Sequence, residues 1–156
     1  MRIGFVAEPY EEDGASGMGY FIRELLVAFL KEKHGHEFVV YSSRPMHEEF
    51  VPGTYRTIRI PRNFVAKLWW FFKMKKDVDV LLFVVPLLPL ILPRGVRSIA
   101  ICQELANFKF PPEYISEKAF AFIRDRILMP TCFARAEKIV AASEATKEDI
   151  IHFYKI

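Results

Sequence analysis

Short apolar segments alternate along this chain with longer amphipathic ones, and little else lies between them. Short apolar runs predict buried strands, whereas apolar residues that recur every three or four positions predict helices. The alternation favours an α/β domain, a three-layer sandwich with a mostly parallel sheet of about six strands. The predicted strands are Arg2–Ala7, Glu37–Tyr41, Tyr55–Ile60 (an edge strand), Val78–Val85, Arg97–Cys102 and Lys138–Ala142. The predicted helices are Tyr20–Lys33, Pro61–Lys76, Ser116–Ala136 (which Pro130 should kink or split) and a last one capped by Ser143.

Length and composition narrow the class of protein further. The 156 residues predict one domain, 1–156, and 52% of them are hydrophobic, so no long segment is expected to be disordered. A net charge of +3 does not indicate a nucleic-acid partner. Cys102, Cys132 and the four histidines show no metal-ligand spacing, so we expect no metal and two buried free thiols. No signal peptide is visible, which predicts a cytoplasmic protein, and the scarcity of Asn and Gln resembles proteins from hot environments.

A glycine-rich turn follows the first predicted strand. Its residues Ser16, Gly17, Met18 and Gly19 lead into the first helix, where small residues let backbone N–H groups approach a phosphate. We interpret the turn as a phosphate or diphosphate site, and the alternative is a purely structural turn. The turn fits a dinucleotide fingerprint badly, because Ile22 replaces the third glycine and no acidic residue ends the second strand.

Polar residues also follow the later strands. Ligands of parallel sheets bind beyond the carboxyl ends of the strands, so Glu8–Gly19, Gln103–Pro112 and Ala142–Thr146 should meet at one edge. There the Glu104 carboxylate could accept hydrogen bonds from sugar hydroxyls or act as a general base. A solvated loop start explains Gln103 and Glu104 equally well.

The last predicted helix begins with Ser143 and Glu144. An N-cap followed by an acidic first turn explains both residues without any ligand. Their position at the expected edge also allows a role facing a substrate.

The segment Phe64–Lys76 combines aromatic residues with four lysines. Projected at about 100° per residue, the lysines scatter around the helix, which favours a core helix with snorkelling lysines over a membrane-surface helix. An exposed Trp69 or Trp70 would favour the membrane-surface helix.

Two longer segments, Ser16–Leu26 and Ala142–Ile150, contain the glycine turn and the start of the last helix. Both resemble the N-terminal domain of family 4 glycosyltransferases of the GT-B architecture, and their order and spacing agree with that family. Between them, Gln103-Glu104-Leu105 and Phe110-Pro111 stand where the family usually carries His-Asp-Leu and a downstream Phe-Pro. The resemblance covers essentially the whole chain and implies a Rossmann-like domain, one half of a GT-B fold.

The resemblance implies a retaining hexosyltransferase that uses a nucleotide-sugar donor and needs neither a metal nor another cofactor. It places the donor diphosphate against Ser16, Gly17, Met18 and Gly19, and the catalytic positions at Gln103 and Glu104. It places the acceptor cleft at Glu8, Tyr10, Asn107, Ser143 and Glu144.

The same resemblance implies a donor-binding C-terminal domain that this sequence does not contain. The expected partners are a separate donor-domain polypeptide and a glycan or lipid-linked acceptor. If Phe64–Lys76 is a membrane-surface helix rather than a core helix, the inner membrane surface is a further partner. We expect little or no sugar transfer by this chain alone. Two alternatives are a stand-alone glycan- or lipid-binding module without catalysis and a nucleotide-cofactor-binding oxidoreductase domain, against which the missing fingerprint argues.

Overall fold

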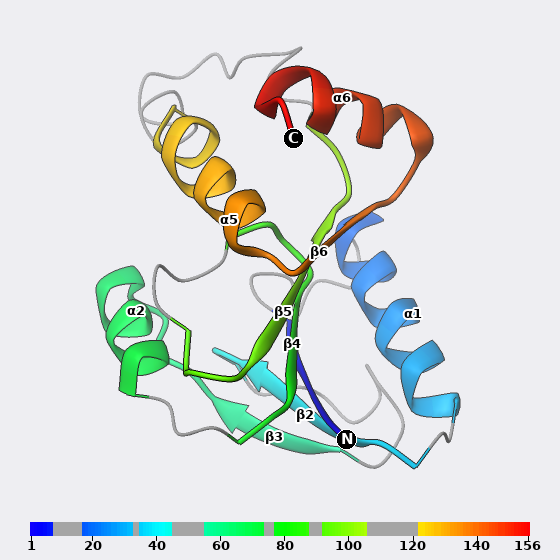
Figure 1. Ribbon diagram of the computed structural model, residues 1–156. Helices are drawn as coiled ribbons and strands as arrows, with labels where there is room; N and C mark the ends of the chain where they lie inside the picture. Colours follow the sequence, from blue (N-terminus) through cyan, green and yellow to red (C-terminus); the bar gives the residue numbers. More distant parts are fainter. Residues whose placement is uncertain (8–16, 33–34, 45–54, 74–76, 88–91, 106–121) are drawn as a thin grey trace.

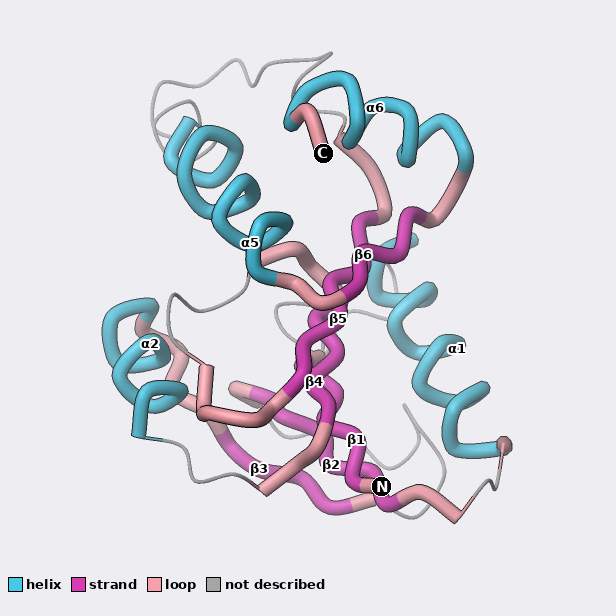
Figure 2. Tube along the Cα trace, viewed as in Figure 1, coloured by secondary structure: helices cyan, strands magenta, loops and turns pink. Residues whose placement is uncertain are grey.

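The computed structural model describes residues 1–7, 17–32, 35–44, 55–73, 77–87, 92–105 and 122–156. These residues form an α/β fold of three layers, a central sheet between helices (Figures 1 and 2), which confirms the predicted class. The strands are β1 (Arg2–Val6), β2 (Glu37–Ser42), β3 (Arg56–Arg59), β4 (Val80–Phe83), β5 (Arg97–Cys102) and β6 (Lys138–Ala141). The helices are α1 (Gly17–Lys31), α2 (Phe64–Lys73), η1 (Arg124–Leu128), α5 (Met129–Arg135) and α6 (Glu144–Tyr154).

The sheet has the order β3-β2-β1-β4-β5-β6, and every neighbouring pair is parallel. The predicted edge position of β3 is confirmed. Ile3 of β1 lies opposite Phe38 of β2 on one side and Val80 of β4 on the other. The chain therefore reverses its direction of travel between β1 and β4, the switch point at which sheets of this order bind ligands.

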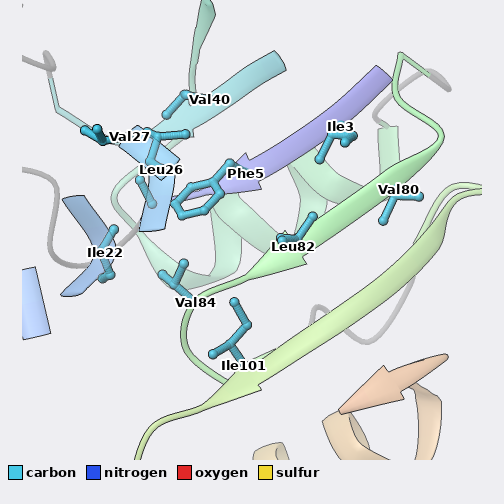
Figure 3. Packing of buried hydrophobic residues seen from close by; sticks show 11 residues of the cluster. Ile3, Phe5, Ile22, Leu26, Val27, Val40, Val80, Leu82, Val84 and Ile101 are labelled. Atoms are coloured by element: carbon cyan, nitrogen blue, oxygen red, sulfur yellow. The ribbon is translucent and has the colours of Figure 1, made fainter. Parts of the chain in front are cut away.

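The two faces of the sheet carry different helices. Ile22 and Leu26 of α1 pack on Phe5, Val84 and Ile101 in one buried cluster (Figure 3). A second cluster contains Phe71 of α2 and Cys132 of α5 together with Tyr41, Leu81 and Ala100. Right-handed crossovers require this division. The connection from β1 to β2, which contains α1, crosses the sheet in one direction, whereas the connections from β3 to β4 and from β5 to β6, which contain α2 and α5, cross it in the other.

Gly4 lies where the central strand meets the second cluster. A Cβ atom at this position would lie 2.6 Å from Leu81 Cδ2 and 2.8 Å from Tyr41 Cε2. Both neighbouring side chains are fully buried. A glycine is therefore required by close packing across the sheet rather than by its backbone conformation.

A third cluster holds the end of the chain. Met129 and Phe133 pack with Cys102 and Leu105, at the end of β5, and with Ile150 of α6. These contacts place α6 beside α5, above the carboxyl ends of the last strands (Figure 1).

Two helices differ from the sequence-based expectation. The helix expected from Pro61 begins only at Phe64, because the Asn63 side chain caps it by accepting hydrogen bonds from the N–H groups of Val65 (3.0 Å) and Ala66 (3.1 Å).

Pro130 does not split the third predicted helix, which is continuous over residues 122–135. Instead the turns before it widen into η1, a π-helix in which the Met129 N–H donates to the Arg124 carbonyl. Proline cannot donate a main-chain hydrogen bond, and the Thr131 hydroxyl donates to the Ile127 carbonyl at 2.6 Å. The proline is thus accommodated by a change of hydrogen-bond pattern.

Candidate functional site

The end of β5 and the start of α6 are joined by one buried side chain. The Thr146 hydroxyl donates to the Gln103 carbonyl at 3.0 Å, across 43 residues of sequence. The Ser143 hydroxyl caps α6 by accepting from the Thr146 N–H at 3.1 Å, which confirms the predicted cap. The Ala142 N–H donates to the Cys102 carbonyl at 3.0 Å. Two of the three predicted segments therefore form one structural unit at the carboxyl end of the sheet.

Thr146 is the residue in this unit that sequence reasoning did not single out. The available signal was a threonine in the first turn of α6, on the same side as buried Ile150. A polar residue on the inward side of a helix needs a hydrogen-bond partner in the protein.

Gln103 carries an unused donor. Its backbone is fixed by Thr146, while its side-chain Nε2 is buried and makes no hydrogen bond to any part of the chain that the structure describes. Cys102 and Leu105, on either side of Gln103-Glu104, are both buried in the third cluster and anchor this turn. A buried amide without a partner costs stability, so this donor is a good candidate to meet a ligand.

Glu104 is exposed, and its carbonyl accepts a weak hydrogen bond from the Cys102 thiol at 3.7 Å. Its carboxylate is therefore open to solvent at the same rim. That placement is compatible both with a substrate-facing role and with a solvated loop start.

The glycine turn enters α1 at Gly17, three residues before the predicted start. Gly17 is exposed, and an added Cβ would meet nothing within 4 Å beyond its chain neighbours and the backbone of its own helix. Gly19 is buried and already interacts with another part of the chain, so Gly17 is the better candidate for contact with a ligand. Ile22 packs on Val84 and Ile101, which places the first turns of α1 over the carboxyl ends of β4 and β5 (Figure 3).

Several predicted site residues lie outside the described residues. They are Glu8, Tyr10, Ser16 and Asn107, together with the side chain of Met18. The predicted meeting of the Glu8–Gly19 segment with the other two is therefore described only from Gly17 onward.

A groove of about 480 Å³ lies between β6 and α6. Two predicted acceptor residues, Ser143 and Glu144, line its polar end, where Glu144 Oε1 accepts from Lys147 Nζ at 2.6 Å. The rest of the lining is apolar, from Ile139, Ala141, Ile150, Ile151 and Ile156. A mainly apolar lining that also carries hydroxyl and charged groups suits an amphipathic ligand.

The two thiols do not contribute nucleophiles. Cys102 and Cys132 are free and buried, as predicted. Burial raises the pKa of the Cys102 thiol to about 12, so the thiol stays protonated at neutral pH. Within the described ranges no three His, Cys, Asp or Glu side chains gather as metal ligands, and no helix there is long and apolar enough to cross a membrane.

No model of a known protein family matches this chain, and no curated protein matches it. The resemblance to glycosyltransferases implied a Rossmann-like fold, and the six-stranded parallel sheet agrees with that fold.

Proposed function

We propose that the chain is the N-terminal, acceptor-side half of a retaining glycosyltransferase that uses a nucleotide-sugar donor. The observation that supports this most is the sheet order β3-β2-β1-β4-β5-β6 with the Gln103–Thr146 unit at its carboxyl end. In sheets of this order the carboxyl rim is where nucleotide-containing ligands bind. The motif resemblance supplies the reaction class.

In this proposal the donor diphosphate lies against the first turn of α1 at Gly17. A helix N-terminus carries partial positive charge, which favours the diphosphate most as negative charge builds up on it during departure. The free Nε2 donor of Gln103 would bind a sugar hydroxyl or a phosphate oxygen, and the Glu104 carboxylate would accept hydrogen bonds from sugar hydroxyls. Metals and other cofactors have no part in this scheme.

The acceptor would occupy the groove between β6 and α6. Its apolar floor favours a lipid-linked or otherwise amphipathic acceptor, with the sugar near Ser143 and Glu144. The same groove fits a second candidate function, a stand-alone glycan- or lipid-binding module, because a largely apolar lining that also carries Ser143, Glu144 and Lys147 could hold an amphipathic ligand without a donor domain.

Complementation tests the first function. The purified chain is assayed across nucleotide-sugars alone and after co-expression with candidate donor-domain chains, and the anomeric configuration of any product is determined by NMR. We expect transfer with retention only in a complemented pair. Transfer by the chain alone would contradict the division of roles proposed here.

Two variants separate ligand contact from folding. Gly17→Ala adds a methyl group that meets no atom within 4 Å beyond its chain neighbours and its own helix backbone, so a loss of diphosphate binding without a loss of thermal stability would report contact with the ligand. Gln103→Ala should lower sugar transfer or nucleotide-sugar affinity by at least about tenfold, the lower limit for the loss of one hydrogen bond to a charged group. Acceptor binding without nucleotide-sugar affinity would support the binding module, and stabilisation by NAD or FAD would support the oxidoreductase alternative.

A further inference from the structure

An aromatic ridge runs along the outward side of α2. It consists of Val65, Trp69 and Phe72, which are 71%, 57% and 51% exposed. The Trp69 and Phe72 rings stack with their centroids 5.4 Å apart. The Lys73 ammonium lies over the Trp69 ring, 4.8 Å from its centroid.

The ridge is not a core face that lacks its partner. The inward side of α2 is already packed, since Phe71 is buried in the second cluster and Trp70 meets Tyr41 edge-on at 5.7 Å. At 100° per residue, the three ridge residues fall within a sector of about 60° on the other side of the helix. One side of α2 is therefore a core side, as predicted. The other side exposes Trp69, the feature that was expected to favour a membrane-surface helix.

The stretch of sequence that contains the ridge carries charge of one sign. Residues 51–76 contain no aspartate or glutamate, although the whole chain has 19 acidic and 22 basic residues. The seven basic residues of this stretch are Arg56, Arg59, Arg62, Lys67, Lys73, Lys75 and Lys76. Of those that the structure describes, Arg59, Arg62 and Lys73 are exposed, and Arg56 pairs with Asp77. A net charge of only +3 is thus distributed very unevenly.

We propose that the aromatic ridge docks on the surface of a bilayer that contains anionic lipids. Tryptophan and phenylalanine enter the headgroup boundary, while the flanking Arg and Lys side chains contact lipid phosphates. Trp, Phe and Arg are also enriched at protein–protein interfaces, whereas lysine is depleted there, so the four lysines of this stretch are what favours a bilayer over a protein partner. The α2 helix has ten residues and lies on the surface rather than spanning the membrane.

This surface lies apart from the candidate site. The α2 helix covers the face of the sheet opposite to α1 (Figure 1), so the proposal stands whether or not the chain transfers sugars. If the chain does transfer sugars, docking would hold it on the same membrane surface as a lipid-linked acceptor.

Vesicle binding by the full chain tests the proposal. Co-sedimentation is measured with phosphatidylcholine vesicles and with vesicles that also contain phosphatidylglycerol. Binding should rise about fivefold for each basic side chain that reaches the anionic surface, and added salt should weaken it. Tryptophan emission should shift to shorter wavelength, and brominated lipids should quench it.

The matched variants are Trp69→Ser with Phe72→Ser for the ridge, and Phe122→Ser as an exposed aromatic elsewhere (64% exposed). The ridge variant should bind at least about tenfold more weakly, whereas the control should bind like the parent protein. Circular dichroism checks that both variants are folded. Equal binding to neutral and anionic vesicles, or unchanged binding by a folded ridge variant, would overturn the proposal. Ridge-dependent dimers in sedimentation velocity without vesicle binding would do so as well, and would make the ridge an interface between copies.

Discussion

Replacing Gly4 with alanine should destabilise the protein through a clash at the centre of the sheet. The new Cβ would lie 2.6 Å from Leu81 Cδ2, 2.8 Å from Tyr41 Cε2 and 3.3 Å from Val78 Cγ1. Carbon atoms in contact prefer about 3.5–4.0 Å, so two neighbours must retreat by roughly 1 Å. Leu81 and Tyr41 are fully buried, so neither can turn into solvent. Overpacking of this kind costs about 1–3 kcal/mol, and we expect the upper half of that range because two fixed neighbours are involved.

Urea unfolding followed by circular dichroism measures this free energy. For a domain of this size each kcal/mol lowers the melting temperature by about 2–4 °C, so a fall of about 4–12 °C is expected for a loss of about 2–3 kcal/mol. Gly17→Ala is the matched control, because its Cβ would meet nothing within 4 Å. Adding Leu81→Val to Gly4→Ala should restore part of the loss in a double-mutant cycle. If Gly4→Ala and Gly17→Ala unfold at the same urea concentration, the packing argument is wrong.

Three further outcomes can be checked on the same protein. Thr146→Val should cost about 1–2 kcal/mol in urea unfolding, because it leaves the Gln103 carbonyl without its donor, whereas Thr146→Ser should cost less than half of that; equal losses would refute a role for the hydroxyl. Burial raises the pKa of the Tyr41 hydroxyl from 10.0 to about 12, so the folded state favours its neutral form and loses this stabilisation as the pH rises from 10 towards 12. Tyr41→Phe should therefore shift the alkaline unfolding midpoint upward, and an unchanged midpoint would count against it. Cys102 and Cys132 are both fully buried, so a disulfide reagent at pH 8 should titrate two thiols in guanidinium and essentially none in the native protein.

The strands could be predicted from local sequence, because a buried strand in a parallel sheet is a short apolar run with sharp ends. The predicted bounds of β5 agree with the structure residue for residue, and the fourth predicted strand, Val78–Val85, contains β4 with two residues to spare at each end. Helix starts were less accurate. The N–H groups in the first turn of a helix have no partner within the helix, so this turn has no strong sequence pattern of its own. Gly17 and Met18 therefore belong to α1, although the sequence predicted a turn at these residues.

The candidate site was predicted only in part, because what assembles it is not local. The hydrogen bond from Thr146 to Gln103 joins residues 43 apart, and no periodicity encodes such a pair. The ridge had a similar limit. Trp69, Trp70 and Phe71 are consecutive aromatic residues, so the pattern alone did not show which of them would face Tyr41 and which would face solvent.

The sheet order also has a consequence for how the protein is made. At the start of β1, Arg2 bonds to Glu37 across 35 residues of sequence and to Asp79 across 77. During synthesis the central strand therefore has β2 beside it long before β4 leaves the ribosome. Until then one row of its main-chain groups lacks a neighbour, next to apolar side chains, and is open to pairing with the wrong strand. Nascent chains that end before β4 should accordingly depend most on chaperones, and those that include it should gain resistance to proteases abruptly.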